Sequence, residues 1–333
     1  MESHLESEIQ FARQHNIGDV LRRSAVRFPD KIAIICGQTE WTYNTFDNAC
    51  NQLARHLLAS GISTGDKVAV IARNSHGFAA IRFAIARIGA VLVPINFMLN
   101  ANEVRYILNS SRSKMLALGP EFIDSGLEAI SEGTAIEITL GLPSEHQSSS
   151  VKTDLRFEGL LTGDATALEI HLDDRSLAQI VYTSGTEAMP KGAMLSHSAV
   201  LWQYTSCIID GEMTASDVIL HALPLYHCAQ LDVFLGPAIY LGMTSTITSD
   251  PSPDNILGLL EKRGISSFFA PPSVWISLLR SPLFDKTNFQ KLEKGYYGAS
   301  IMPVEILTEL QQRLPKLRLW NLYGQTEMAP VAT

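Results

Sequence analysis

The sequence predicts an α/β fold of two packed subdomains, each built on a largely parallel sheet. Short, continuously apolar runs such as 67–72 and 90–94 are typical of strands that are buried on both faces of a parallel sheet. Helical patterns separate these runs, and the alternation of strand, helix and strand predicts βαβ units. The chain has 333 residues, which is long enough for two domains. We therefore expect approximate subdomains over 67–195 and 196–333.

The first predicted elements are two strands over 31–36 and 39–42, and Gly37-Gln38 turns the chain between them. These strands are expected to join the second subdomain. A helix over 43–59 follows because apolar residues recur on one face, and Gly61 lies where a helix C-cap favours positive φ. A strand over 67–72, a helix over 78–88 and a strand over 90–94 then form the first βαβ unit.

The second half continues the alternation after a polar, loop-like segment over 144–153. The predicted elements are a strand over 177–182, a helix over 197–210, a strand near 218–223, a helix near 254–263, a strand over 266–270, a helix over 273–280, and strands near 294–297 and 317–322. The last residues, Val331 to Thr333, offer no terminal helix, cap or closing strand. The pattern therefore ends as a truncated fold would.

The composition indicates a globular protein, with 46% apolar and 18% charged residues. A net charge of −8 without any block of Lys and Arg argues against a nucleic-acid partner. Four scattered cysteines without C-x-x-C spacing argue against a disulfide framework and favour a reducing cytosol. No secretory signal is recognisable, and Arg82, Arg87 and Pro94 interrupt the most apolar stretch, so no transmembrane segment is expected and the predicted location is cytoplasmic.

The most informative segment is the loop Tyr182-Thr-Ser-Gly-Thr-Glu-Ala-Met-Pro-Lys-Gly192, which follows an apolar strand. Its small residues let backbone N–H groups approach phosphate oxygens, its hydroxyls add donors, and Lys191 supplies a positive charge. The P-loop pattern G-x-x-x-x-G-K-[ST] does not fit, because Pro190 replaces the second glycine and Gly192 replaces the Ser or Thr. A plain surface loop remains the alternative for this segment taken alone.

This loop resembles the signature Y-T-S-G-T-T-G-x-P-K-G of the adenylate-forming superfamily, which includes acyl- and aryl-CoA synthetases, and nine of eleven positions agree. The departures are Glu187 and Ala188. They either slow nucleotide binding or, as we expect, lie at a loop tip that points into solvent. Three further segments resemble motifs of the same superfamily in the same order: Leu223-Pro-Leu-Tyr-His227, Gly298-Ala-Ser300 and Asn321-Leu-Tyr-Gly-Gln-Thr-Glu327. Segments 41–43, 66–70 and 89–94 resemble its N-terminal region.

The resemblance implies an acyl-adenylate-forming N-terminal domain that binds ATP. It assigns the nucleotide site to Thr183, Ser184, Gly185, Thr186, Lys191, Gly298, Ala299, Ser300, Tyr323, Gly324 and Thr326. Within this set Tyr323 would stack on adenine, Thr326 would touch the α-phosphate, and Thr186 would hold Mg²⁺ with Glu327. The implied catalytic residues are Lys191, Thr326, Glu327 and His227, the last of which would border the substrate carboxylate. Taken singly, Tyr323 and His227 also fit core residues, and Glu327 fits a solvated loop carboxylate.

The implied reaction joins a carboxylic acid to ATP, releases pyrophosphate, and passes the acyl group to the thiol of CoA. His227 stands where amino-acid-activating relatives carry an Asp, so a fatty acid is the first expectation and an aryl acid the second. Cys228, Ala229, Leu231, Phe234 and segment 268–275 would line the acyl pocket or serve as ordinary core. Activation for a carrier protein and a non-catalytic nucleotide-binding remnant remain alternatives, and a homodimer is compatible with the sequence.

In this superfamily a ribose-binding Asp and a small C-terminal lid domain with its catalytic lysine follow the last motif. The present chain ends six residues after Glu327. We therefore expect residues 1–333 to lack the lid, to bind ATP weakly at best and not to turn over.

Overall fold

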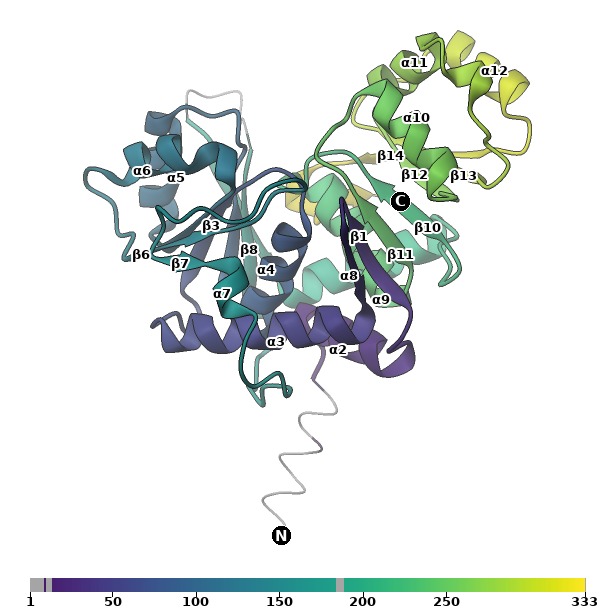
Figure 1. The fold of residues 1–333 in the computed structure, drawn as a ribbon. Coiled ribbons are helices and arrows are strands. Elements are labelled where there is room, and N and C mark those ends of the chain that lie inside the picture. The colour runs from purple at the N-terminus through teal and green to yellow at the C-terminus, as the bar shows by residue number, and fades with distance from the viewer. Residues whose placement is uncertain (1–8, 10–13, 184–188, 333) are drawn as a thin grey trace.

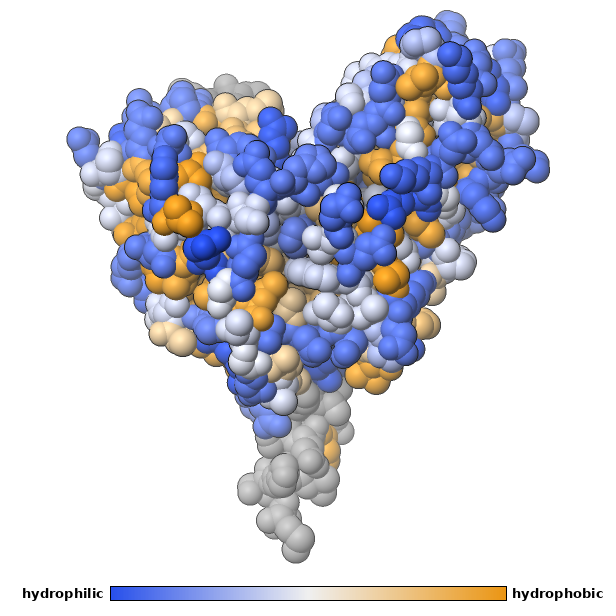
Figure 2. Space-filling view, viewed as in Figure 1, coloured by the Kyte–Doolittle hydropathy of each residue, from blue (hydrophilic) through white to orange (hydrophobic). Residues whose placement is uncertain are grey.

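The computed structural model describes residue 9, residues 14–183 and residues 189–332, which form two lobes (Figure 1). One lobe is built on a seven-stranded sheet and the other on an eight-stranded sheet. A notch separates the upper parts of the two lobes on the face seen in Figure 2. The α/β class with two largely parallel sheets, expected from the sequence, is confirmed.

The seven-stranded sheet has the order β7-β6-β5-β3-β4-β8-β9. Its strands are β3 (Lys67–Ile71), β4 (Val91–Pro94), β5 (Ser113–Leu118), β6 (Ile138–Gly141), β7 (Leu155–Arg156), β8 (Leu177–Thr183) and β9 (Lys191–Ser196). All neighbours are parallel except β8 and β9, which pair antiparallel. The central strands are buried on both faces, as their continuous apolar runs predict.

The eight-stranded sheet has the order β15-β14-β13-β12-β10-β11-β1-β2. Its strands are β1 (Ile32–Cys36), β2 (Thr39–Thr42), β10 (Val218–His221), β11 (Thr244–Ile247), β12 (Ser267–Phe269), β13 (Lys294–Gly298), β14 (Arg318–Gly324) and β15 (Val331–Ala332). Antiparallel pairing is confined to the two edges, at β1 with β2 and at β14 with β15. The hairpin β1–β2 is attached to the sheet through β11, which runs parallel to β1.

Helices cover both sheets and fill the space between them (Figure 1). They are α2 (Ile17–Arg27), α3 (Tyr43–Ala59), α4 (His76–Arg87), α5 (Ala101–Ser111), α6 (Ile123–Ile130), α7 (Phe157–Leu160), α8 (His197–Asp210), α9 (Gly236–Leu241), α10 (Pro253–Lys262), α11 (Pro272–Arg280) and α12 (Val304–Arg313). Shorter helical turns are η1 (Pro120–Phe122), η2 (Ala229–Leu235), η3 (Phe284–Lys286) and η4 (Thr326–Met328). None of the helices in the described part of the chain is both long and apolar enough to cross a membrane.

The largest apolar core lies between the sheets and joins the lobes. It contains residues of both sheets, such as Ile34 and Val68, together with helix residues such as Phe46 and Phe83, all at most 1% exposed. The amphipathic face expected for the helix over 43–59 is the face of α3 that enters this core. Gly61, with φ of +86°, follows α3 as predicted.

Two elements differ from the sequence-based expectation. The C-terminal residues Val331 and Ala332 do form a closing strand, β15, which pairs with Tyr323 and Gly324 of β14, so the expectation of no such strand was wrong. The end of the informative loop is also strand, because Lys191 begins β9. Lys and Gly are uncommon in strands, and it is the pairing with β8 that imposes the extended conformation here.

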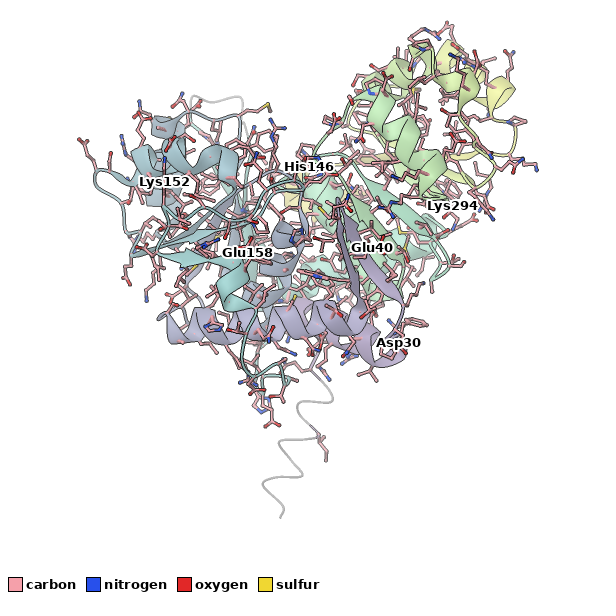
Figure 3. All side chains as sticks on the ribbon, in the orientation of Figure 1. Asp30, Glu40, His146, Lys152, Glu158 and Lys294 are labelled. Atoms are coloured by element: carbon pink, nitrogen blue, oxygen red, sulfur yellow. The ribbon has the colours of Figure 1, made fainter. Side chains whose placement is uncertain are left out.

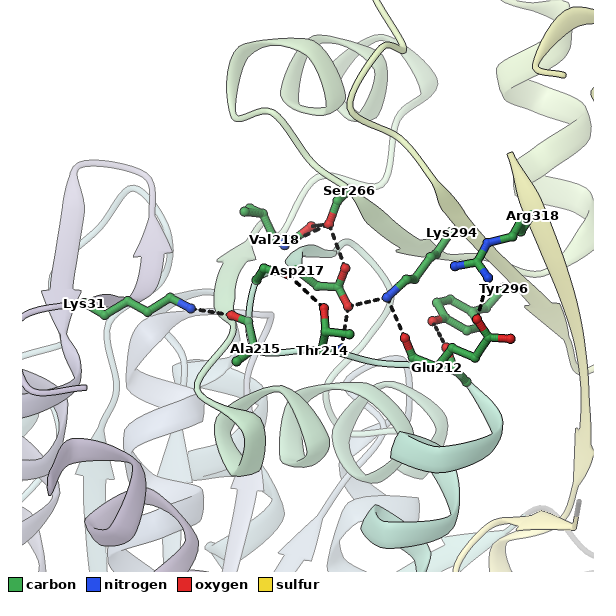
Figure 4. A network of polar contacts seen from close by, with 12 residues as sticks. Lys31, Glu212, Thr214, Ala215, Asp217, Val218, Ser266, Lys294, Tyr296 and Arg318 are labelled. Atoms are coloured by element: carbon green, nitrogen blue, oxygen red, sulfur yellow. Dashed lines mark hydrogen bonds and ion pairs between the residues drawn. The ribbon is translucent and has the colours of Figure 1, made fainter. Parts of the chain in front are cut away.

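A buried polar network fixes the amino ends of the strands in the eight-stranded sheet (Figure 4). The Asp217 carboxylate, just before β10, accepts hydrogen bonds from the Lys294 ammonium at 2.7 Å and from the Thr214 backbone N–H at 2.8 Å. Ser266 donates a third hydrogen bond, and Lys294 also donates to the Glu212 carbonyl at 2.6 Å. Because Lys294 opens β13 and Gly298 closes it, this network lies at the opposite end of β13 from the cavity described next.

Polar contacts also join the lobes near the labelled His146 in Figure 3. Glu145 accepts hydrogen bonds from the Ser249 backbone N–H at 2.7 Å and from the Thr248 hydroxyl at 3.0 Å. Asn74, just after β3, donates to the Leu223 carbonyl and accepts from the Leu225 N–H, both at 2.7 Å. The first lobe therefore holds the segment that leads into His227.

Candidate active site

A cavity of 480 Å³ lies where β8, β13 and β14 end. The turn η4 and the helical turn η2 close its sides. Its walls include Thr183, His227, Gly298, Ala299, Tyr323, Gly324, Thr326 and Glu327. All four motif regions picked out in the sequence therefore contribute to one cavity. Ligand sites at the carboxyl ends of strands are usual in open α/β sheets.

The loop region enters the cavity through Thr183, the last residue of β8. Lys191 is the register partner of Thr183, and β9 also contacts η4. The strand that Lys191 opens is therefore in contact with the turn that carries Thr326 and Glu327, although Lys191 itself is not among the residues that line the cavity. The predicted nucleotide residues Ser184, Gly185 and Thr186, together with Glu187 and Ala188, lie outside the described residues.

Two glycines bring backbone to the cavity without side chains. A Cβ on Gly298 would lie 2.4 Å from the Leu322 carbonyl oxygen, and one on Gly324 would lie 1.9 Å from that of Pro330. Such contacts exclude any side chain, so the glycines permit the close approach of β13, β14 and the segment before β15. Ala299 follows with φ of +67° and lines the cavity, whereas the exposed Ser300 is not among the lining residues.

Tyr323 and Glu327 both face the cavity. The Tyr323 side chain is 72% exposed, so the interpretation of this residue as a core aromatic is wrong. Glu327 is also exposed, which leaves its carboxylate accessible to a ligand or to solvent. Thr326 between them is buried, and its hydroxyl lies 3.4 Å from the Cys228 sulfur.

His227 is exposed toward the cavity rather than enclosed in the core. Its Nδ1 accepts a hydrogen bond from the Ala229 backbone N–H at 3.2 Å, which leaves the ring proton on Nε2 as a donor. Desolvation by the surrounding walls lowers the pKa of His227. A neutral imidazole that donates from Nε2 is suited to a hydrogen bond with an anionic oxygen.

The cavity wall formed by η2 is anchored to the first lobe by a buried polar cluster. Asp232 of η2 accepts hydrogen bonds from Gln179 of β8 at 2.6 Å and from Arg82 of α4 at 3.3 Å. All three side chains are at most 1% exposed. Burial raises the pKa of Asp232, and the Arg82 charge opposes that effect. The cluster fixes the position of η2 relative to β8, and therefore of Phe234 relative to Thr183.

The deep end of the cavity is apolar. Of the residues proposed from sequence for an acyl pocket, Cys228, Ala229, Phe234 and Phe269 line it, whereas Leu231, Phe268 and Trp275 belong to other parts of the core. Sequence reasoning missed the lining residues Val233, Leu322, Gln325, Pro330 and Val331. Val233 precedes Phe234 and Leu322 precedes Tyr323 in the sequence. Their position next to a predicted site residue was the signal that could have identified them.

A second cavity, of 220 Å³, shares Thr183, His227 and Thr326 with the first. Its other walls include Pro94 at the end of β4, Asn96 just after it, and Tyr226. The three shared residues therefore stand between two spaces and are reachable from both.

Several residues that line the cavity carry side-chain oxygen atoms. They include Thr183, Thr326 and Glu327, and oxygen is the ligand that Mg²⁺ prefers. In the described ranges no group of three or more His, Cys, Asp and Glu side chains is placed to hold a metal.

Comparison with known proteins assigns the family. The family described as "AMP-binding enzyme" matches residues 21–333, which is nearly the whole chain. The chain belongs to this family. The AMP-binding family members that resemble it include a feruloyl-CoA synthase of Amycolatopsis (27% identical, covering 96% of this chain and 61% of the relative). The indoleacetate–CoA ligase of Aromatoleum aromaticum is 29% identical, over 93% of this chain and 58% of that protein.

A medium-chain fatty-acid–CoA ligase of Escherichia coli is 27% identical over 95% of this chain and 56% of its own length. The chain thus spans about 60% of the length of these AMP-binding relatives. Among solved structures, the inhibitor-bound N-terminal domain of FACL13 from Mycobacterium tuberculosis superimposes with a TM-score of 0.85 at 24% identity, covering 95% of this chain and 77% of that one. This likeness establishes a shared fold.

Proposed function

We propose that the protein binds ATP with Mg²⁺ and activates a carboxylic acid as an acyl-adenylate, which then forms a thioester with CoA. The observation that carries the proposal is the convergence of Thr183, His227, Gly298 and Tyr323, one from each of four separate motifs, on one cavity. Membership of the AMP-binding family and the CoA-ligase names of its relatives support the same reaction.

Each residue has a distinct task in the proposed reaction. Tyr323 stacks on adenine beside the Gly298–Ala299 turn, while Thr183, Thr326 and Lys191 bind phosphate oxygens. Glu327 holds Mg²⁺, whose charge offsets the repulsion between the anionic acid and the nucleotide. His227 donates from Nε2 to the acid carboxylate and orients it toward the α-phosphate. No general base is needed, because the attacking carboxylate is already ionised at neutral pH.

The thioester step requires a separate route to the acyl carbon, because the nucleotide blocks the approach through the 480 Å³ cavity. The 220 Å³ cavity offers such a route, since it reaches His227 and Thr326 from the side of Pro94 and Tyr226. We assign the approach of the CoA thiol to this cavity.

The nucleotide site is tested by calorimetric titration of the 333-residue chain with ATP, in the presence of Mg²⁺ and of EDTA. We expect Mg²⁺ to strengthen ATP binding in the parent chain. Glu327→Gln should weaken binding of MgATP by about tenfold, or about 1.4 kcal/mol, and should remove the dependence on Mg²⁺.

Glu305→Gln is the matched control, because Glu305 is an exposed carboxylate on α12 that does not line the cavity. It should bind MgATP as the parent does. Equal Mg²⁺ dependence in Glu327→Gln and in the parent would refute the metal role, and absence of ATP binding by the parent would refute the site. Acid-dependent ATP–pyrophosphate exchange over a panel of acids, measured on the full-length protein, tests the reaction itself.

A further inference from the structure

The apolar end of the main cavity stops at two stacked rings. Phe234 of η2 and Phe269 at the end of β12 have ring centroids 4.5 Å apart and planes inclined by 20°. Both line the cavity, yet Phe234 is completely buried and Phe269 is only 4% exposed. The cavity therefore meets the edge of a packed aromatic layer.

This layer is fixed from behind. The Tyr296 ring lies 5.2 Å from that of Phe234, and its hydroxyl donates to the Gly211 carbonyl at 2.6 Å. The Tyr296 carbonyl accepts from the Trp275 indole N–H at 3.1 Å. Further residues of the same cluster, including Ile219, Ala238 and Met243, are completely buried. Protein interiors are close-packed, so a ligand cannot extend past the two phenylalanines without displacing this cluster.

We infer that Phe234 and Phe269 form the closed end of the acid subsite, and that the protein takes a compact carboxylic acid, a short alkyl or single-ring acid, in preference to a long-chain one. This preference for a compact acid refines the function proposed above and rests on it. The size of the cavity supports it. At 480 Å³ the space lies in the lower half of the range of about 300–1,000 Å³ for small-molecule sites, and it must hold both the nucleoside and the acid.

The test is a calorimetric series on the unaltered chain with stable acyl-adenylate mimics. The probes are sulfamoyladenosine and its N-acetyl, N-butanoyl, N-benzoyl, N-octanoyl and N-hexadecanoyl derivatives. In an open apolar tunnel each added methylene would strengthen binding about fourfold. At a closed end we expect binding to strengthen up to the butanoyl or benzoyl derivative and then to weaken by about tenfold for octanoyl and hexadecanoyl.

Two variants distinguish the closed end from other causes of size selection. Phe269→Leu shortens the barrier and should strengthen binding of the octanoyl derivative by about threefold or more relative to the parent. Phe268→Leu is the matched control, because Phe268 is the neighbouring residue on β12 but packs against Trp275 in a different core cluster. It should leave the whole series unchanged.

The outcomes distinguish failure of the proposed size preference from failure of the function on which it rests. A steady gain in affinity from acetyl to hexadecanoyl, or equal gains in the two variants, would overturn the closed end and leave the nucleotide site standing. Failure of sulfamoyladenosine and of all its derivatives to bind would refute the proposed function, and the compact acid with it.

Discussion

Tyr323 illustrates how one residue acquires a task from its place on a strand. It is the next-to-last residue of β14, where the strand passes the Gly298–Ala299 turn, and its partner Ala332 on β15 lies on the edge of the sheet. The ring is therefore 72% exposed at the cavity rather than packed in the core. The exposed ring is accessible to a ligand in the cavity, and a purine base is a suitable stacking partner for it.

At this scale we predict that Tyr323→Ala weakens ATP binding by about tenfold, because base stacking on an aromatic side chain contributes about 1–3 kcal/mol. Its free energy of unfolding should change by no more than about 0.5 kcal/mol, since the ring is exposed. Titration calorimetry and urea denaturation measure the two quantities. Tyr323→Phe retains the ring and should bind ATP as the parent does. Unchanged affinity in the alanine variant would contradict stacking.

At the scale of an element, β13 has different constraints at its two ends. Its first residue, Lys294, is 4% exposed and pairs with the buried Asp217 at 2.7 Å, whereas its last residue, Gly298, lines the cavity. Stability and ligand binding are thus assigned to opposite ends of one strand. Loss of one partner from a buried ion pair leaves an uncompensated charge, which is more costly than loss of the pair.

We therefore predict that Lys294→Met lowers the free energy of unfolding by about 3 kcal/mol without changing the affinity of the remaining folded protein for ATP. Lys291→Met should have an effect near zero, because Lys291 is exposed. Urea denaturation monitored by circular dichroism gives the first quantity, and calorimetry on the folded variant gives the second. A loss below about 1 kcal/mol would mean that the network contributes little to stability.

At the scale of the whole molecule, the region between the sheets contains histidines that burial keeps neutral. Desolvation lowers the pKa of His197 and of His221 to about 3 and that of His76 to about 4. His197 opens α8, and its Nδ1 accepts a hydrogen bond from the Ile17 backbone N–H at the start of α2. The lowered pKa values mean that the unfolded chain binds more protons than the folded one below pH 6.5. The stabilisation is thus complete above that pH and is lost as the pH falls toward the folded values.

We predict that the parent chain loses stability on acidification and that His197→Asn, which retains an acceptor near the Nδ1 position, loses less. Between pH 6 and pH 5 the slope of unfolding free energy against pH should be shallower in the variant by about 1 kcal/mol per pH unit. Urea denaturation at the two pH values provides the measurement. His171→Asn, at an exposed histidine, should retain the parent slope. Parallel slopes for parent and His197→Asn would show that His197 is not the neutral buried group.

The sequence by itself determined the elements whose signals are local. Apolar runs predicted the parallel strands, Gly61 predicted the end of α3, and the order of the motifs predicted the family. Such features depend on residues close together in the chain, where backbone preference and apolar periodicity act directly.

Only the tertiary structure decided features that depend on distant partners. Lys191 and Val331 became strand residues because β8 and β14 offered open edges, which no local preference indicates. The exposure of Tyr323 and the position of Phe269 at the end of the cavity, with Phe268 in another core, likewise followed from packing across the sheet. Burial and proximity arise when the whole chain packs, so they are properties of the fold and not of any segment alone.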